Sequence, residues 1–243
     1  MGIDFSVVIP AYNEADYLEP TLRSVREQDY KGKVELIVVD NNSSDDTSKI
    51  ARRYADHVLH YAERQGASAA RQHGAEMSRG KAIVFLDADT AMSPNMLSEA
   101  AKSLAAGHVG GRAPIVVKDD SFGARWTEVV VNNWHRFIGP SFIPYLYCTR
   151  DVFHQTGGWD LNVTCAEEVR LQRRIREFGT LAWDMKARTV TDARRYKAEG
   201  YYLLAFKGVL AQFFGLNLTW RPIRALPSAI ESQESDATVS VRR

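Results

Sequence analysis

Short, almost continuously apolar runs alternate with stretches of helical period over the first part of the chain. The expected strands are residues 5–9, 34–39, 57–61 and 82–86. Strands that are apolar at nearly every position are typical of a parallel sheet with helices on both faces. Between the first two strands, Leu18, Leu22 and Val25 recur at helical spacing and form one apolar helix face. The pattern predicts an α/β fold with right-handed crossovers, in which ligands gather at the carboxyl ends of the strands.

The rest of the chain continues the same pattern less regularly. Further helices are expected around residues 50–54, 67–77, 94–106, 122–137, 166–178 and 200–214, and further strands at 109–118, 143–148 and near 189. Because neither an internal repeat nor a Ser/Gly-rich linker interrupts the chain, we expect one domain over residues 1–226. Its nucleotide-binding half would be about 1–90 and its acceptor half 91–226. Small polar residues predict a flexible tail at 227–243.

The charge balance and the termini limit the class of protein. Lys and Arg number 31 against 30 Asp and Glu, a net charge of +1. A general nucleic-acid-binding protein needs a basic excess to displace counterions, so we expect no nucleic-acid partner. No basic, apolar leader precedes the first expected strand, which favours a cytoplasmic location. The longest charge-free apolar stretch near the end, 208–220, has 13 residues. A membrane span needs about 20, so we expect no insertion.

Polar residues follow the first two expected strands, at the edge where the ends of parallel strands meet. Tyr12 and Glu14 lie in the first turn, and the second turn begins at Asp40. The Asp40 carboxylate can accept a hydrogen bond from a base edge, and the Tyr12 ring offers a face for stacking. The simpler alternative is that Asp, Ser and Thr side chains in these turns cap the following helices.

A second acidic motif follows the fourth expected strand. Asp87 and Asp89 place two carboxylates, two residues apart, at the end of that strand. Hard oxygen ligands of this kind can hold Mg²⁺ or Mn²⁺, which in turn can bridge the phosphates of a nucleoside diphosphate. The alternative is again a turn with two capping carboxylates. No glycine-rich dinucleotide or Walker loop follows a strand, which disfavours redox and ATPase chemistry.

Together these motifs resemble family 2 glycosyltransferases with a GT-A nucleotide-sugar-binding fold. The resemblance is carried by VVIPAYNE at 7–14, VVDNNSSDDT at 38–47, Gly66 with Ala70-Arg71 and Gly74, FLDAD at 85–89, and GGWD at 157–160 before Glu167-Glu168. It implies a mostly parallel central sheet flanked by helices, with a helical extension on the acceptor side. It also implies an inverting, metal-dependent transfer of a sugar to a hydroxyl group, with UDP as the family's commonest nucleotide.

The resemblance further implies which residues bind the donor. Those expected around the base and ribose are Pro10, Ala11, Tyr12, Glu14, Asp40 and Arg71. Those expected around the sugar and the diphosphate are Asp87, Ala88 and Asp89, with Asp89 as the ligand of Mg²⁺ or Mn²⁺. The chain departs from the family at Arg64 and Gln72, where Asn is usual.

Two neighbouring glutamates are candidates for the catalytic base. An inverting transfer needs a carboxylate that takes the proton of the attacking acceptor hydroxyl. Residues from Thr164 to Glu167 have the form of a capping box, in which Glu167 folds back onto the helix backbone. Glu168 is then free, and it also stands at the position of the family's catalytic Asp. We therefore predict Glu168 as the base and Glu167 as the alternative. The structural alternative is that both are acids of the first helical turn, stabilised there by the helix dipole.

The acceptor side is less specific. Trp159, next to Gly158, is a candidate platform for an acceptor sugar, and Arg194 and Arg195 should follow a strand near the site. The segment from Arg170 to Glu199 carries an excess of five positive charges. This excess suits a phosphate-bearing partner, such as the donor diphosphate, a polyprenyl phosphate or lipid headgroups. The alternative is a solvated helix face.

The apolar helix expected at 200–214 could cover the core, pair with a second copy of the chain, or lie peripherally on the inner face of a membrane. Packing is the favoured interpretation. The predicted function is an inverting glycosyltransferase whose hydroxyl acceptor is lipid-linked, a glycan or a small molecule. The alternatives are a nucleotide-sugar-binding subunit without catalysis and a sugar nucleotidyltransferase. The latter needs a Gly-rich loop after the first strand, which this chain lacks.

Overall fold

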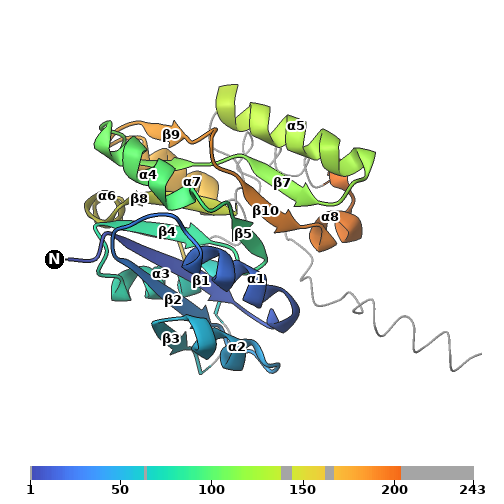
Figure 1. Ribbon diagram of the computed structural model, residues 1–243, viewed down its shortest axis with the longest axis horizontal. Helices are drawn as coiled ribbons and strands as arrows, with labels where there is room; N and C mark the ends of the chain where they lie inside the picture. Colours follow the sequence, from blue (N-terminus) through green and yellow to red (C-terminus); the bar gives the residue numbers. More distant parts are fainter. Residues whose placement is uncertain (1, 63–64, 138–143, 162–166, 204–243) are drawn as a thin grey trace, which may run out of the picture.

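The computed structural model describes residues 2–62, 65–137, 144–161 and 167–203. Within them, seven strands form a central sheet in the order β3-β2-β1-β4-β8-β6-β9 (Figure 1). From one edge to the other these are His57–His60, Val34–Asp40, Phe5–Ala11, Ala82–Leu86, Tyr145–Thr149, Gly110–Arg112 and Leu181–Trp183. Only β8 runs against its two neighbours among these strands, so the prediction of a mostly parallel sheet is confirmed.

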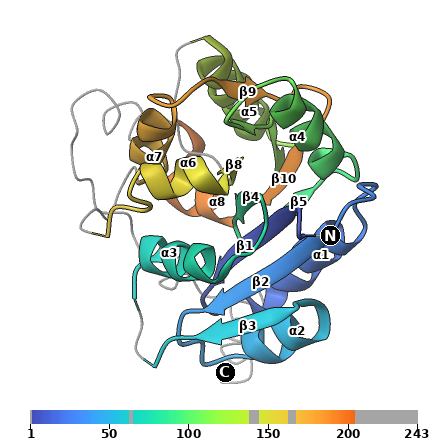
Figure 2. The same cartoon turned by 90° about the vertical axis from the view of Figure 1, so that its left-hand side faces the viewer.

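Helices cover both faces of the central sheet (Figure 2). Those on one face are α1 (Ala15–Arg26), α2 (Thr47–Tyr54) and α4 (Met96–Ala105). Those on the other face are α3 (Ala67–Met77), α6 (Arg150–Gln155) and α7 (Glu167–Ile175). Strand β1 explains the apolar runs in the sequence, because Val7 packs into the first layer, Val8 packs into the second, and neither side chain is exposed. Helix α1 buries the predicted face of Leu18, Leu22 and Val25.

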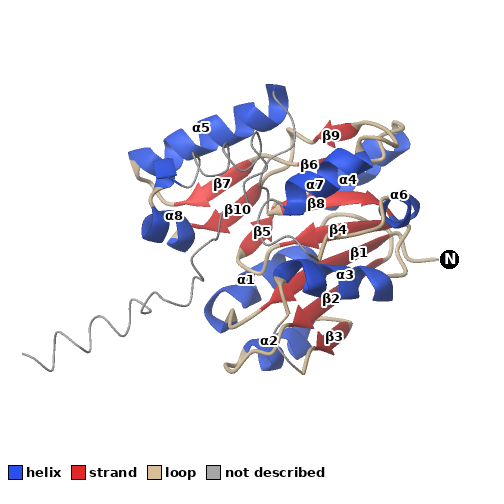
Figure 3. Ribbon diagram, turned by 180° about the vertical axis from the view of Figure 1, so that it is seen from behind, coloured by secondary structure: helices blue, strands red, loops and turns tan. Residues whose placement is uncertain are grey.

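A second, three-stranded sheet lies beside the first and was not predicted. Its order is β5 (Thr90–Met92), β10 (Thr189–Asp192) and β7 (Ile115–Lys118). Figure 3 shows helix α5 (Phe122–Phe137) packed along this small sheet, and helix α8 (Arg194–Glu199) following β10. Three-residue strands such as β5 carry too short a pattern to be recognised, and they gain their hydrogen bonds from residues about 100 positions away.

The single strand expected at 109–118 is wrong. The segment is divided between β6 in the central sheet and β7 in the small sheet, on either side of Pro114. Proline has no N–H to donate to a ladder, so it breaks a strand at such a position. The carbonyl of Pro114 instead accepts a hydrogen bond from the Thr189 N–H at 2.8 Å, which helps to fix β10.

The structure describes only part of the C-terminal region for which the sequence predicts a helix and a tail. Gly200 has a φ of +87° and ends α8, and residues 201–203 directly after it are again helical, so the described start of the helix expected at 200–214 agrees with the prediction. Most of that expected helix, the tail at 227–243 and the charge-free stretch at 208–220 lie outside the described residues. None of the helices that the structure does describe is both long and apolar enough to span a bilayer.

Candidate active site

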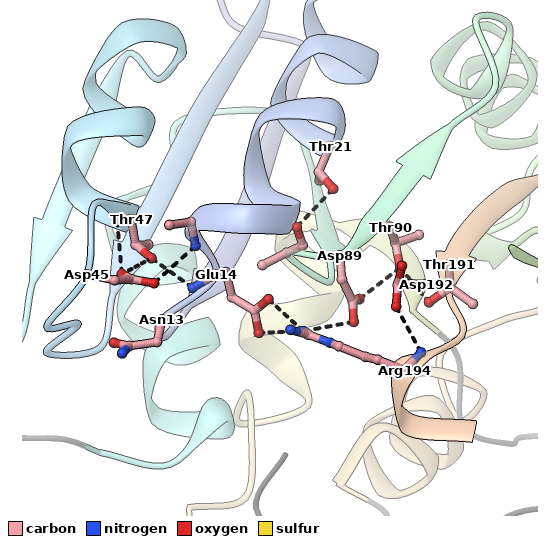
Figure 4. Close-up of polar contacts among 12 residues, drawn as sticks. Asn13, Glu14, Thr21, Asp45, Thr47, Asp89, Thr90, Thr191, Asp192 and Arg194 are labelled. Atoms are coloured by element: carbon pink, nitrogen blue, oxygen red, sulfur yellow. Dashed lines mark hydrogen bonds and ion pairs between the residues drawn. The ribbon is translucent and has the colours of Figure 1, made fainter. Parts of the chain in front are cut away.

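The turns after β1 and β2 are tied together at the carboxyl edge of the sheet. Asn13 and Asn42 both adopt left-handed backbone conformations, with φ of 52° and 66°, which asparagine tolerates better than most residues. The Asn13 N–H donates to Ser43 Oγ at 2.9 Å, and the Glu14 N–H donates to Thr47 Oγ1 at 2.8 Å. The two turns therefore form one rigid wall, part of which is visible in Figure 4.

Asp40, the last residue of β2, stabilises this wall. Its Oδ1 accepts from the Ser43 N–H at 2.9 Å, and its Oδ2 accepts from the Ser48 hydroxyl. Asp40 is 3% exposed, and its carboxylate holds the turn and accepts from a side chain of α2, whereas the N-cap residue of α2 is Asp46, which makes no side-chain capping bond. The predicted contact of Asp40 with a base stays a prediction, as do the donor contacts of Pro10, Ala11 and Tyr12, which end β1 and begin the first turn.

Asp87, Ala88 and Asp89 link the two sheets. They lie between the end of β4 and the start of β5. Ala88 is buried, and its carbonyl accepts from Thr21 Oγ1 at 2.9 Å. The Asp89 carbonyl accepts from the Asp192 N–H at 3.1 Å. The backbone of the motif is thereby held by helix α1 on one side and by strand β10 on the other, so each carboxylate has a defined position.

Arg71 of helix α3 connects the donor-side acids with the two glutamates. Its guanidinium lies 2.7 Å from Asp87 Oδ1, 3.3 Å from Glu167 Oε1 and 3.6 Å from Glu168 Oε1. It also lies over the ring of Trp159, with the guanidinium carbon 5.0 Å from a ring centroid. The Arg71 side chain is 7% exposed. The sequence analysis placed Arg71 near the nucleotide, but it did not foresee that this arginine joins acids separated by 80 residues.

Loss of the Arg71 charge should destabilise the fold strongly. In Arg71→Leu, two largely buried carboxylates, Glu167 and Glu168, and the partly exposed Asp87 would lose their shared counter-charge. Removing one partner of a buried ion pair costs about 3–5 kcal/mol. We expect the free energy of unfolding, measured by urea denaturation, to fall by about 3 kcal/mol. The control is Arg53→Leu, which breaks the exposed pair with Glu19 and should cost less than about 1 kcal/mol. Equal losses in the two variants would contradict the central role of Arg71.

Glu168 differs from Glu167 in its surroundings. Burial, and then the neighbouring charge of Glu167, raise the pKa of Glu168 to about 8, although the charge of Arg71 acts in the opposite direction. Its Oε2 atom is buried and has no hydrogen-bond partner among the described residues. An unpaired buried carboxylate oxygen is costly unless a ligand supplies a partner. Thr164 lies outside the described residues, so the proposed capping box is not tested.

Arg194, at the start of α8, joins Glu14 of the first turn with Asp89 (Figure 4). Its Nη2 lies 2.7 and 2.5 Å from the two Glu14 carboxylate oxygens and 3.1 Å from Asp89 Oδ2. The guanidinium carbon also lies 4.0 Å from the centroid of the Tyr17 ring. Burial raises the pKa of Glu14 to about 7 and raises that of Asp89, while the Arg194 charge opposes both shifts. Sequence reasoning expected Arg194 near the site but on its acceptor side, and it missed Tyr17.

The acidic cluster has the ligand chemistry to hold a divalent metal. Two carboxylates, those of Glu14 and Asp89, already converge on a positive charge, and Mg²⁺ and Mn²⁺ prefer such hard oxygen ligands. Among the described residues, no group of three or more His, Cys, Asp or Glu side chains is arranged to hold a metal. Asp89 is the ligand that the family motif implies, Glu14 lies beside it on the same guanidinium, and phosphate oxygens and water would complete the coordination.

Trp159 is not the exposed platform that the sequence analysis expected. Its side chain is 4% exposed and is covered by Arg71. Its ring contacts the Phe85 ring edge-on, with the two ring centroids 5.0 Å apart. A ring of this size stabilises the fold more in the core than at the surface, and here it supports Arg71. Gln72, one of the departures from the family pattern, holds the loop in place, because its Oε1 accepts from the Trp159 N–H at 2.9 Å. Sequence reasoning did not assign Gln72 this role.

The loop before Trp159 needs its glycines. Gly157 and Gly158 have φ of +77° and +75°, and a Cβ at Gly158 would collide with Gln72. Arg174 of α7 donates to the Gly158 carbonyl at 2.6 Å and so ties the loop to the helix that carries the two glutamates. The acceptor role predicted for Gly158 therefore stays a prediction, beside a clear structural role.

Much of the predicted basic surface is neutralised within the chain. Arg170 pairs with Asp160 at 3.3 Å, Lys197 pairs with Asp119 at 3.3 Å, and Arg195 pairs with Glu199 at 3.7 Å. These contacts weaken the interpretation of the whole segment as a phosphate-binding face. Of the basic side chains predicted to bind the acceptor, Arg194 is placed at the candidate site, and the role of Arg195 stays a prediction.

Comparison with known proteins tests the family assignment. A model described as glycosyl transferase family 2 matches residues 6–161. The chain belongs to this family. The glycosyltransferase AglE of Haloferax volcanii is 44% identical over 90 residues, which are 35% of this chain and 30% of AglE. A Campylobacter jejuni GalNAc(5)-diNAcBac-PP-undecaprenol β-1,3-glucosyltransferase is 31% identical over 99 residues, 38% of this chain and 32% of the relative. The matched regions thus span about a third of these family members.

Solved structures show that the fold of this family member is GT-A. Staphylococcus aureus TarS 1–349 superposes with a TM-score of 0.65 at 18% identity, covering 86% of this chain and 66% of TarS. The mannosyltransferase PcManGT of Pyrobaculum calidifontis, in complex with GDP-Man and Mn²⁺, gives 0.64 at 23% identity, covering 84% of this chain and 64% of PcManGT. At this level of identity the likeness concerns the fold alone. The fold expected from the sequence motifs is confirmed.

Proposed function

We propose that this chain transfers a sugar, with inversion, from a nucleoside diphosphate sugar to a hydroxyl acceptor. The observation that carries the proposal is the position of Arg71, which lies within 2.7 Å of Asp87 and 3.6 Å of Glu168. Residues of the acidic donor motif and the candidate base therefore line one site, although they are far apart in the sequence. This convergence is what a direct displacement between two bound substrates requires.

The residues of the site divide into donor and acceptor functions. Asp40 and the two turns at the carboxyl edge would position the nucleotide, and Asp87 would face the ribose or the sugar. The unpaired Oε2 of Glu168 would accept the proton of the attacking hydroxyl. Arg71 would hold Glu168 in place, and its positive charge would act on both Asp87 of the donor side and Glu168 of the acceptor side. When bound at Asp89, Mg²⁺ or Mn²⁺ would stabilise the negative charge on the departing diphosphate.

The relatives support particular substrate classes. TarS has been crystallised with UDP-GlcNAc and PcManGT with GDP-Man and Mn²⁺, which supports a uridine or guanosine diphosphate sugar as donor, and we propose UDP. The named substrate of the C. jejuni relative is linked to undecaprenol, which supports a lipid-linked acceptor over a glycan or a small molecule. We also propose a single domain over residues 1–226 and a cytoplasmic location, with membrane contact and pairing of two copies as open alternatives.

A donor panel tests the proposed function. Release of nucleoside diphosphate from UDP and GDP sugars would be measured with Mn²⁺ or Mg²⁺ and undecaprenyl-diphosphate-linked sugars as acceptors. We expect metal-dependent release that the acceptor stimulates, and a product of inverted anomeric configuration by NMR. Tight donor binding in calorimetry, without release under any acceptor, would instead favour the non-catalytic subunit. The family assignment and the absence of a Gly-rich loop argue against a nucleotidyltransferase.

The pH dependence of kcat/KM should reflect the ionisation of the proposed base, Glu168. Glu168 must be deprotonated to accept a proton, and its pKa is raised to about 8 by burial and by the charge of Glu167. We therefore expect kcat/KM to rise about tenfold per pH unit below pH 8 and to level off above it. The measurement is nucleoside diphosphate release between pH 6 and 10 at saturating Mn²⁺.

Glu167→Gln is the informative variant for this profile. Because the Glu167 charge raises the pKa of Glu168, its removal should move the rising limb to lower pH and leave the plateau within about tenfold of wild type. An unchanged limb would show that the profile reports another group. Loss of the plateau would identify Glu167 as the base.

A further inference from the structure

The two carboxylates of the acidic motif are each paired with a different arginine. Asp87 pairs with Arg71, which lies on a long helix in the core and is 7% exposed. Asp89 pairs with Arg194, whose side chain is 16% exposed and which begins a six-residue helix at the rim. Arg194 is thus the more accessible of these two cations, and it faces the carboxylate that fits a metal.

The position of Arg194 is set by the small sheet. Thr90 and Thr191 are neighbours in the β5–β10 ladder, and the Arg194 N–H donates to Asp192 Oδ1 at 2.8 Å. These contacts place the first turn of α8 directly beside Asp89, whose own carbonyl binds the Asp192 N–H. The guanidinium therefore lies within reach of Asp89, 3.1 Å from its Oδ2.

Three groups hold the guanidinium in this place. Both carboxylate oxygens of Glu14 and one of Asp89 contact the same Nη2 atom, and the Tyr17 ring lies 4.0 Å from the guanidinium carbon. A charge-assisted pair stacked on an aromatic face is a strong arrangement when largely removed from water. A hydrated metal ion would have to displace it while gaining fewer than three protein ligands, since the described residues hold no three-ligand cluster.

We propose that Arg194 acts as a tethered cation that occupies the Asp89 site until the donor arrives, and then transfers to the donor diphosphate. The inference rests on the proposed function. Guanidinium groups bind phosphate oxygens in the same fork geometry as carboxylates, so the diphosphate offers Arg194 an equivalent partner. The metal displaces Arg194 from Asp89, and the diphosphate offers Arg194 a new partner. The metal and the diphosphate therefore bind together. The metal alone binds weakly because Arg194 competes with it, which couples the two binding equilibria.

Binding of Mn²⁺ to the full chain tests this proposal without any turnover. Free Mn²⁺ is measured by its electron paramagnetic resonance signal, with and without UDP, and with GDP in parallel. We expect wild type to bind Mn²⁺ alone weakly and to gain at least about tenfold in Mn²⁺ affinity when the nucleoside diphosphate is present. In Arg194→Gln, Mn²⁺ alone should bind about tenfold more tightly than in wild type, and the gain from UDP should shrink.

Two further variants make the result decisive. Lys197→Gln removes a positive charge from the same helix, where it pairs with Asp119, and should leave Mn²⁺ binding unchanged. Tyr17→Leu keeps every charge but removes the stacked ring. It should raise the affinity for Mn²⁺ alone by a few fold, and it provides the test if Arg194→Gln does not fold. An equal gain in Lys197→Gln would reduce the effect to net charge and overturn the proposal.

Failure of the proposed function and failure of the role of Arg194 give different results in this experiment. If wild type binds no Mn²⁺ even with UDP or GDP, the proposed function fails together with this inference. If wild type binds Mn²⁺ only with the nucleoside diphosphate, but the folded Arg194 and Tyr17 variants gain no affinity for Mn²⁺ alone, only the role of Arg194 is overturned.

Discussion

Glu168→Gln should abolish sugar transfer while leaving the protein folded and able to bind its donor. A positioned general base contributes about 10²–10⁴-fold, so we expect kcat to fall by about 10³-fold at the pH optimum. Donor affinity should change little, because Glu168 belongs to the acceptor side of Arg71. The raised pKa of Glu168 shows that its buried site disfavours the charged form, so a neutral glutamine should not lower the melting temperature.

The measurements are acceptor-dependent release of nucleoside diphosphate, calorimetric donor binding and thermal unfolding. Glu167→Gln, adjacent on the same helix turn, is the matched comparison and should keep activity within about tenfold of wild type. If the two variants exchange their effects, Glu167 is the base. If both keep wild-type turnover, neither glutamate takes the proton and the proposed mechanism is wrong.

Asp89→Asn should remove the metal dependence of donor binding. The amide keeps the size of the carboxylate but not its charge, so the ion would lose its only expected protein ligand and the charge on the leaving diphosphate would be less stabilised. Loss of one electrostatic stabiliser of this kind lowers the rate by about 10²–10³-fold. We therefore expect kcat/KM to fall by that factor, and donor binding to become insensitive to Mn²⁺.

Calorimetric titration of the donor, with Mn²⁺ or with a chelator, checks this expectation. Asp119→Asn provides the control, because Asp119 follows β7 and pairs with Lys197 away from the acidic motif. It should leave both kcat/KM and the response to Mn²⁺ unchanged. Full metal dependence in Asp89→Asn would mean that the ion is held elsewhere.

The neighbouring parallel strands and the order of the motifs could be predicted from the sequence. Strand β1 is buried on both faces, and helix α1 has an apolar stripe, so their local patterns report their tertiary surroundings directly. The positions of Asp40 and of the acidic motif followed from strand ends in the same way, because parallel strands bring their carboxyl ends to one edge. The two glutamates follow helix α6 and no strand, and only the family resemblance pointed to them.

Other features depended on contacts between distant segments. Strands β5 and β9 have three residues each, and such short segments become strands only when a partner supplies hydrogen bonds. Trp159 resembled a surface platform in sequence, but packing against Phe85 and Arg71 buries it. The break at Pro114 was not predicted, and only the pairing of β7 with β10 showed that a second sheet begins there.

The sequence by itself determined the fold family and the chemical groups available, because both are encoded in local periodicity and in motif spacing. The tertiary structure alone decided which groups meet. Arg194 reaches Glu14 across 180 positions of the chain, and Arg71 reaches Glu167 across 96. Such pairings depend on how two sheets and their helices pack together, and no local pattern of residues carries that information.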